Sequence, residues 1–143
     1  MFNNPSPDAI RALLEKTRRI AVVGLSPKAD RDSNRVARYL MERGYQIFPV
    51  YPREDTILGQ KVYRSVREIP GGVDIVDVFR RGEDLPEVVD DALAGTAPAL
   101  WFQLGCVHEA SAARAAAAGL TVVMDRCIMV DHAGLLGRSW AAS

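Results

Sequence analysis

The sequence has few of the residues that build disulfide scaffolds and metal centres. It contains two cysteines and two histidines. Cys106 and Cys127 lack the C-x-x-C spacing of a metal or redox motif, and no Cys/His cluster is present. Two isolated cysteines suit a reducing compartment, where packing explains a buried thiol more often than reactivity does. We therefore expect neither a disulfide framework nor a metal site.

The sequence also lacks an excess of charge and any long hydrophobic run. Eighteen basic residues balance eighteen acidic ones, so no overall field attracts nucleic acid or a membrane, and any anion site must be local. No stretch approaches the ~20 apolar residues of a membrane span. The start, MFNNPSPDAI, has neither the basic nor the apolar part of a signal peptide. We expect a cytoplasmic protein that binds neither nucleic acid nor membrane.

What the sequence does contain is an alternation of short apolar runs and amphipathic stretches. Its apolar fraction of 48% and charged fraction of 25% are those of a globular protein, and 1–143 is predicted to be a single domain. The predicted strands are 20–23, 46–50, 73–79, 99–102 and 120–124. The predicted helices are one beginning after Ser6 and others at about 33–43, 85–93 and 108–118. The tail from Cys127 to Ser143 has weaker periodicity and is predicted to be loop with at most one helical turn.

This alternation is typical of parallel βαβ units. We predict an α/β fold of the Rossmann-like, doubly wound kind, with a mostly parallel sheet of about five strands and helices on both faces. Ligands bind such sheets at the carboxyl ends of the strands, where the strand order reverses. Pro49 indicates a strand end or an edge position for the second strand rather than a central one, and Gly44 is the predicted end of the second helix.

The stretch that follows the first strand resembles a phosphate-binding turn. The common dinucleotide fingerprint G-x-G-x-x-G is absent, and Gly24 begins a longer loop that carries Ser26, Lys28 and Arg31. Asp32 or Ser33 is then expected to cap a helix whose N-terminus adds free N–H groups and a positive dipole end. A strand, a loop and a helix N-terminus in this order favour a ligand with several phosphates, although a solvated charged loop has the same composition.

The end of the second predicted strand narrows the choice of ligand. A nicotinamide dinucleotide without an additional phosphate usually meets an acidic residue there. Here the segment is Val50-Tyr51-Pro52-Arg53, and an arginine favours a phosphate on the ribose. NADP carries that phosphate at the 2′ position and coenzyme A at the 3′ position. Both ligands remain open at this point.

Five segments together resemble the small CoA-binding protein family: IAVVGLSPKADRDSNRVARYL, FPVYPR, VDIVDVFRR, LWFQLG and VVMDRC. Those proteins are similar to the N-terminal CoA-binding domain of the succinyl-CoA synthetase α subunit. The resemblance runs from about residue 10 to residue 132. It implies a Rossmann-like domain that holds coenzyme A, or an acyl-CoA, across the point where the strand order reverses.

The resemblance also implies binding residues at four strand ends. Residues after the first strand would contact the phosphates and begin the helix that follows. Residues after the second strand would flank the adenosine, with Arg53 near the 3′-phosphate. Those after the third would line the rim, and those after the fourth would approach the pantetheine arm. The set comprises Gly24, Ser26, Lys28, Arg31, Ser33, Asn34, Tyr51, Pro52, Arg53, Phe79, Arg80, Arg81, Gln103, Leu104 and Gly105.

Two positions depart from the family pattern. Ala29 stands where the family commonly has a second proline, which loosens the turn slightly. Tyr51 stands where the family usually has asparagine, so an amide that could bond the ribose or adenine is lost. The tyrosine ring could instead stack on adenine, which would offset part of that loss.

Residues that could perform catalysis do not form a convincing constellation in the sequence. His108 is predicted to be a surface residue at a helix start, and His132 to lie on a loop beside Asp131. Asp74 and Asp77 are three apart, so on a strand they would face opposite sides. We therefore favour a CoA-binding module without catalysis of its own. The alternatives are an NADP-dependent oxidoreductase and a regulatory subunit that has lost ligand binding.

Oligomeric state is open at this level. An exposed sheet edge could pair two chains, and so could the apolar stripe of the first helix, formed by Ile10, Leu13, Leu14 and Thr17. Either contact would give a homodimer.

Overall fold

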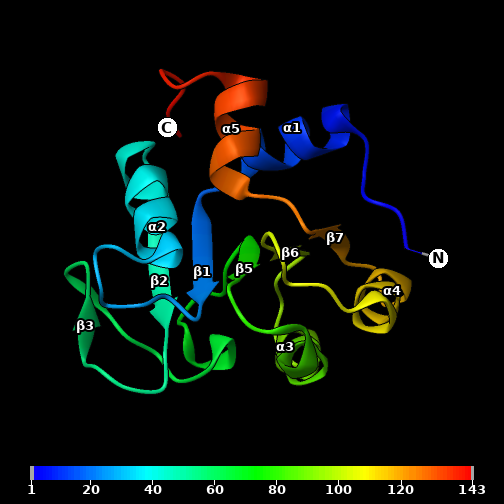
Figure 1. The fold of residues 1–143 in the computed structure, drawn as a ribbon, viewed down its shortest axis with the longest axis horizontal. Coiled ribbons are helices and arrows are strands. Elements are labelled where there is room, and N and C mark those ends of the chain that lie inside the picture. Colours follow the sequence, from blue (N-terminus) through cyan, green and yellow to red (C-terminus); the bar gives the residue numbers. More distant parts are fainter. Residues whose placement is uncertain (1, 143) are drawn as a thin grey trace.

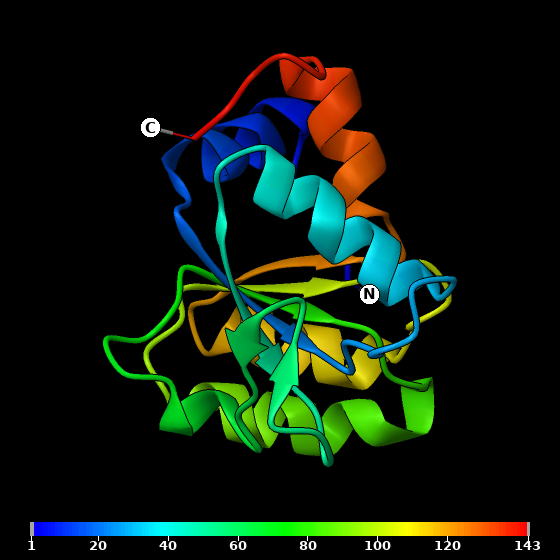
Figure 2. The same cartoon turned by 90° about the vertical axis from the view of Figure 1, so that its left-hand side faces the viewer.

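A parallel sheet lies between two layers of helices (Figures 1 and 2). This computed structural model describes residues 2–142, and within them the strand order of the five-stranded sheet is β2-β1-β5-β6-β7, with a short hairpin of β3 and β4 beside it. The elements are α1 (Pro7–Lys16), β1 (Arg19–Val23), α2 (Asp32–Glu42), β2 (Gln46–Val50), β3 (Thr56–Ile57), β4 (Gln60–Lys61), η1 (Val66–Glu68), β5 (Ile75–Val78), η2 (Gly82–Asp84), α3 (Leu85–Leu93), β6 (Ala99–Phe102), α4 (Glu109–Ala117), β7 (Thr121–Met124) and α5 (Ile128–Leu136).

The predicted doubly wound sheet is confirmed, and its strand order reverses between β1 and β5. The chain passes from β1 to β2 on one side and then returns to place β5 on the other side of β1. The central strands β5 and β6 are buried along their whole length, because helices cover both faces of the sheet. Ligands of such folds bind beside this reversal.

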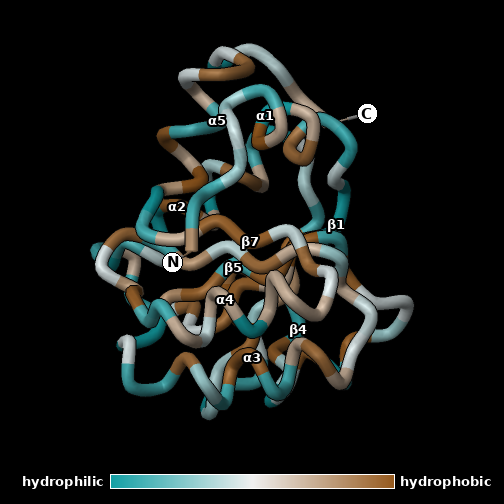
Figure 3. Tube along the Cα trace, turned by 90° about the vertical axis from the view of Figure 1, so that its right-hand side faces the viewer, coloured by the Kyte–Doolittle hydropathy of each residue, from teal (hydrophilic) through white to brown (hydrophobic). Residues whose placement is uncertain are grey.

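The two faces of the sheet carry separate hydrophobic cores. Helices α3 and α4 pack on one face, and α1, α2 and α5 pack on the other (Figure 2). Hydrophobic segments accordingly run through the middle of the molecule, between the two helix layers (Figure 3). Among residues 2–142, no helix has the length and hydrophobicity needed to cross a bilayer.

The first helix begins and packs as its sequence predicts. The Ser6 side chain accepts a hydrogen bond from the Ala9 N–H, and Pro7 occupies the first turn. Ile10, Leu13 and Leu14 are buried in the core that α1 shares with α5. That apolar stripe is therefore used inside the chain and is not free to pair two chains.

The prediction for the C-terminal region was wrong. Residues expected to form a loop form α5, which packs against α1 and α2 (Figure 1). His132, expected on a loop, is fully buried in this helix, and its Nδ1 lies 2.7 Å from the Tyr39 hydroxyl. Asp131 is buried as well and accepts two hydrogen bonds from Arg126. Polar residues with partners fill positions where the sequence pattern expects apolar ones.

The buried His132 should make the protein less stable in mild acid. Burial, with Arg43 nearby, holds the pKa of the His132 imidazole below its ordinary value of 6.5. The unfolded chain therefore takes up a proton that the folded chain resists, and this contribution to stability is present above pH 6.5 and is lost as the pH falls. The free energy of unfolding, measured in urea between pH 7 and pH 5, should fall more steeply in the unaltered protein than in His132→Phe. Equal slopes would contradict this.

Both edges of the sheet are partly closed by other segments of the chain. At the β2 edge, Pro49 has no N–H to offer, and its carbonyl accepts from the Tyr63 N–H; the predicted edge position of Pro49 is thus confirmed. At the β7 edge, the Asn4 side chain donates to the Met124 carbonyl and accepts from the Met124 N–H, at 3.0 and 2.8 Å. Asn4 thus pairs with β7 as a strand would.

Candidate functional site

The residues predicted to bind a ligand lie in four loops, except Ser33 and Asn34, which lie in the first turn of α2. These loops follow β1, β2, β5 and β6, and in a parallel sheet the carboxyl ends of the strands share one edge. This edge, called the carboxyl edge below, includes the reversal between β1 and β5. By strand, the residues are Gly24, Ser26, Lys28, Arg31, Ser33 and Asn34; Tyr51, Pro52 and Arg53; Phe79, Arg80 and Arg81; and Gln103, Leu104 and Gly105.

The turn after β1 is held in shape by its own side chains. Ser33 Oγ accepts from the Ser26 N–H at 3.0 Å, and Ser26 Oγ accepts from the Lys28 N–H at 3.1 Å. Asn34 donates from Nδ2 to the Ser26 carbonyl, and its Oδ1 accepts from Arg38. The expected capping of α2 by Asp32 or Ser33 is wrong: α2 begins after Arg31 without a side-chain cap. Ser33 instead closes the turn.

Gly24 allows two loops of the carboxyl edge to touch. Its φ is +84°, in the region that favours glycine, and a Cβ placed there would lie 2.3 Å from the Phe79 carbonyl oxygen. Its N–H donates to the Val50 carbonyl at 2.9 Å. The turn after β1, the end of β2 and the loop after β5 thus meet at this one residue.

Three cationic side chains at the carboxyl edge are not neutralised by the chain. Within residues 2–142, the charged groups of Lys28, Arg31 and Arg53 form no hydrogen bond or ion pair, although Arg53 lies 5.7 Å above the Tyr51 ring. Arg80 and Arg81, predicted for the rim, are instead paired with Asp84 and Glu83. Lys28 and Arg31 lie at the uncapped N-terminus of α2, and Arg53 lies after the end of β2.

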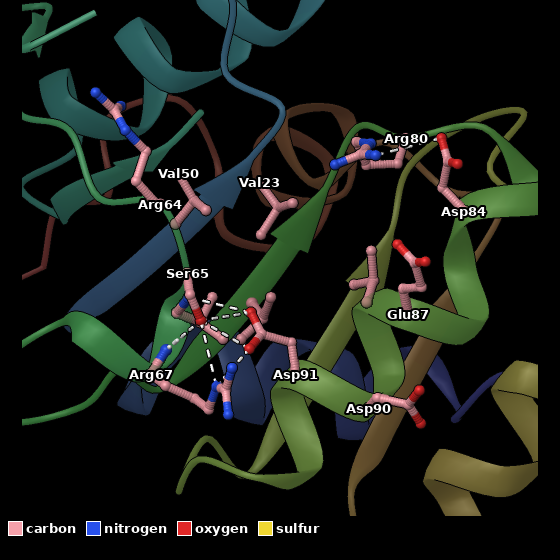
Figure 4. A pocket seen from close by; sticks show the side chains of 13 residues that line it. Val23, Val50, Arg64, Ser65, Arg67, Arg80, Asp84, Glu87, Asp90 and Asp91 are labelled. Atoms are coloured by element: carbon pink, nitrogen blue, oxygen red, sulfur yellow. Dashed lines mark hydrogen bonds and ion pairs between the residues drawn. The ribbon is translucent and has the colours of Figure 1, made fainter. Parts of the chain in front are cut away.

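A pocket of about 470 Å³ opens beside β1, β2 and β5 on the α3 face (Figure 4). We call it the valine pocket, because Val23, Val50, Val76 and Val88 line it. Its polar wall includes Ser65, whose hydroxyl donates to both oxygens of Asp91 at 2.7 and 2.8 Å. Of the predicted site residues, Arg80 lines this pocket. The lining combines five valines with eight polar or charged residues, so a flat heterocycle would find both apolar contacts and hydrogen-bond partners there.

Arg64 also lines the valine pocket, and the sequence did not single it out. Its Nη1 donates to the backbone carbonyls of Tyr51, Arg53 and Glu54, at 2.9, 2.9 and 3.0 Å. Arg64 therefore holds the loop that carries Arg53. Contacts from a side chain to backbone carbonyls leave no pattern in the sequence, so no signal could have identified this role.

A second pocket, of about 290 Å³, opens on the opposite face of the sheet. We call it the Gln103 pocket; Gln103, Phe79, Leu104, Cys127, Met129 and Val130 line it, together with Asp32, Arg35 and Val36 of α2. It is mostly apolar and adjoins the start of α2. Cys106 does not line this pocket: it is buried in the core on the α3 face, and burial raises the pKa of its thiol, which disfavours a thiolate.

Asp77 lies beneath the Gln103 pocket, fully buried in β5. Gln103 donates from Nε2 to Asp77 Oδ1 at 2.5 Å, and burial raises the pKa of the Asp77 carboxyl to about 8. Asp74 lies outside the strand and accepts from the Arg18 and Arg19 N–H groups, so the two aspartates do not pair, in agreement with the sequence interpretation. The burial of Asp77 itself was missed.

The histidines and acidic residues of the described chain do not form a metal site. Between residues 2 and 142, no three His, Cys, Asp or Glu side chains gather as metal ligands. His108, predicted to be a surface residue, is half-buried and caps α4, where Nδ1 accepts from the Ser111 N–H at 3.2 Å.

The sheet order, the turn after β1 and the two pockets define a Rossmann-like domain. The family described as CoA binding domain matches residues 18–133, and the chain belongs to that family. Over 132 residues the chain is 46% identical to the uncharacterized protein YneT of Bacillus subtilis, covering 92% of this chain and 98% of YneT. A solved structure of a hypothetical protein from Pyrococcus horikoshii is 37% identical, with a TM-score of 0.90 and coverage of 96% and 99%.

A more distant similarity connects the chain to a much longer enzyme. Over 59 residues it is 42% identical to the α subunit of an ADP-forming acetate–CoA ligase of Pyrococcus furiosus. The aligned part is 41% of this chain and 13% of that subunit. The expected resemblance to the CoA-binding domain of succinyl-CoA synthetase-like enzymes is therefore confirmed at the level of family and fold.

Proposed function

We propose that this protein binds coenzyme A, or an acyl-CoA, at the carboxyl edge of its sheet and performs no catalysis there. The observation that carries the proposal is a set of cations that form no ion pair within residues 2–142: Lys28 and Arg31 at the uncapped N-terminus of α2, and Arg53 after the end of β2. Phosphates bind well where free N–H groups, the positive end of a helix dipole and cationic side chains converge. Membership of the CoA-binding domain family supports the same ligand.

The two pockets suggest how such a ligand would lie. The valine pocket would take the adenine, and the turn after β1 would take the diphosphate. Arg53, held in its loop by Arg64, would meet the 3′-phosphate. The pantetheine arm would cross the reversal between β1 and β5 and enter the Gln103 pocket. Pro52, Tyr51 and Gly105 remain predicted neighbours of the ligand.

Isothermal titration of the purified protein with coenzyme A tests this proposal. A few charge-assisted contacts and a buried adenine, less the cost of association, correspond to a Kd of roughly 1 μM. Dephospho-CoA, which lacks the 3′-phosphate, should bind more weakly. Binding of NADPH in place of coenzyme A would favour the oxidoreductase alternative, and binding of neither would favour a regulatory subunit.

Replacing Arg53 by alanine should weaken coenzyme A about tenfold or more, because a charge-assisted contact to the 3′-phosphate contributes roughly 1.5–3 kcal/mol. The affinity for dephospho-CoA should change by less than about twofold, since that ligand lacks the phosphate that Arg53 would meet. Arg11→Ala, at an exposed site on α1, is the control and should leave both affinities unchanged. Equal losses for both ligands in Arg53→Ala would contradict the assignment.

A further inference from the structure

The carboxyl group of Asp77 stands in the middle of the sheet, where an apolar side chain would be expected. Asp77 is fully buried, and its neighbours in register are Val22 on β1 and Trp101 on β6. Its Oδ2 is one of three buried side-chain polar atoms without a hydrogen-bond partner in the described chain. A buried polar atom without a partner costs free energy, so such a group calls for an explanation.

Packing does not explain this carboxyl group. The other residues of β5 are Ile75, Val76 and Val78, and a valine at position 77 would continue the same buried run. Burial also raises the pKa of the Asp77 carboxyl to about 8, so this group is mainly neutral at pH 7. What distinguishes Asp77 from a valine is its hydrogen bond to Gln103.

That hydrogen bond fixes one end of the Gln103 amide. Nε2 donates to Asp77 Oδ1 at 2.5 Å, and the amide oxygen of Gln103 has no partner within residues 2–142. Gln103 is 3% exposed, yet it lines the Gln103 pocket beside Phe79 and Leu104. Because the amide nitrogen is held toward the sheet, the amide oxygen is the group left for the pocket.

We propose that Asp77 is a positioning residue that holds the Gln103 amide so that its oxygen accepts a hydrogen bond from an N–H group of the bound ligand. The ligand class is a chain that carries secondary amides, with little net charge, in a mainly apolar pocket. In coenzyme A this is the pantetheine arm, so the inference rests on the proposed function. The contact gives the pocket a preference for an amide over a plain hydrocarbon or ester chain of the same length.

Two ligands and two variants separate this role from a structural one. Adenosine 3′,5′-bisphosphate shares the adenosine end of coenzyme A but has no pantetheine. Asp77→Val removes the acceptor for Gln103, whereas Asp77→Asn keeps an oxygen at that position. Titration calorimetry should show Asp77→Val binding coenzyme A about tenfold more weakly, the loss of roughly one hydrogen bond. The bisphosphate should be unaffected, and Asp77→Asn should bind both ligands as the unaltered protein does.

A second variant shows whether Asp77 acts through Gln103. Gln103→Leu should cause the same loss for coenzyme A, and the double variant with Asp77→Val should lose no more than either single one, since both remove one contact. Gln103→Leu leaves β5 unchanged, so it keeps the test valid if Asp77→Val fails to fold. Amide spectra by NMR check that each variant is folded.

The outcomes distinguish this inference from the proposed function. Unchanged affinity for coenzyme A in both Asp77→Val and Gln103→Leu would overturn the positioning role while leaving CoA binding intact. An equal loss for coenzyme A and the bisphosphate would also overturn it, because Asp77 would then act on the whole sheet edge. No binding of either ligand to the unaltered protein would overturn the proposed function and this inference together.

Discussion

Gly24→Ala should lower the free energy of unfolding by roughly 2–5 kcal/mol, the sum of a backbone cost and a steric cost. A non-glycine residue at a φ of +84° pays roughly 1–2 kcal/mol. The new Cβ would lie 2.3 Å from the Phe79 carbonyl oxygen, a backbone atom that can move only if β5 and its loop move. Such overpacking costs a further ~1–3 kcal/mol. Urea denaturation followed by tryptophan fluorescence, to which the buried Trp101 contributes, measures the change.

Gly59→Ala separates the two costs. Gly59 has a φ of +74°, and a Cβ there meets nothing within 4 Å. This control should therefore lose only the backbone cost, roughly 1–2 kcal/mol. A loss in Gly24→Ala no larger than that in Gly59→Ala would show that the loops after β1 and β5 separate easily. The close approach would then contribute little to the shape of the carboxyl edge.

Asp77→Asn should stabilise the protein by at least about 2 kcal/mol at pH 8. The folded protein keeps a proton on Asp77 up to about pH 8, whereas an ordinary aspartate releases it near 3.8. Folding above pH 3.8 must therefore neutralise this group, and each pH unit between these values costs up to roughly 1.4 kcal/mol. Asparagine carries no charge and keeps an oxygen for the Gln103 Nε2. The asparagine variant therefore avoids the free-energy cost of neutralising a carboxyl group and keeps the hydrogen bond to Gln103.

The stability difference between Asp77→Asn and the unaltered protein should depend on pH in one direction. The contribution of Asp77 to stability is fully present below pH 3.8 and is lost as the pH rises through 8, so the advantage of Asp77→Asn should grow from pH 5 to pH 8. Comparing the two proteins at each pH removes the opposite contribution of His132. Asp55→Asn, at an exposed site, should change stability by no more than about 0.5 kcal/mol. An advantage that shrinks as the pH rises would contradict the buried neutral carboxyl.

The sheet was predictable because its central strands are buried on both faces. Apolar runs such as Val76 and Val78 or Leu100 and Phe102 need no alternation when helices cover both sides. The strand ends then follow, and with them the four loops that carry the candidate site. The resemblance to a known family added the identity of the ligand, which no spacing of residues could supply.

Three features were beyond the reach of the sequence for one physical reason. Ser33 closes a turn through a backbone N–H seven residues earlier, Arg64 binds three backbone carbonyls, and α5 buries His132 against Tyr39. Each depends on a polar group and a distant partner, whereas periodicity reports only which side of an element is apolar. In α5, buried Asp131 and His132 interrupt the apolar pattern, so the sequence of this helix predicts a loop.

The two closed sheet edges bear on how the protein behaves at high concentration. An open edge presents a row of unpaired N–H and C=O groups, and a strand of another molecule can form hydrogen bonds with them. Such pairing is a common first step of aggregation. Here the Asn4 amide occupies both backbone groups of Met124, and Pro49 removes a donor from β2. Edge-to-edge joining of sheets from two chains is thereby disfavoured at both ends. Asn4→Ala frees the Met124 N–H and carbonyl, and with them a place where a neighbouring molecule could attach.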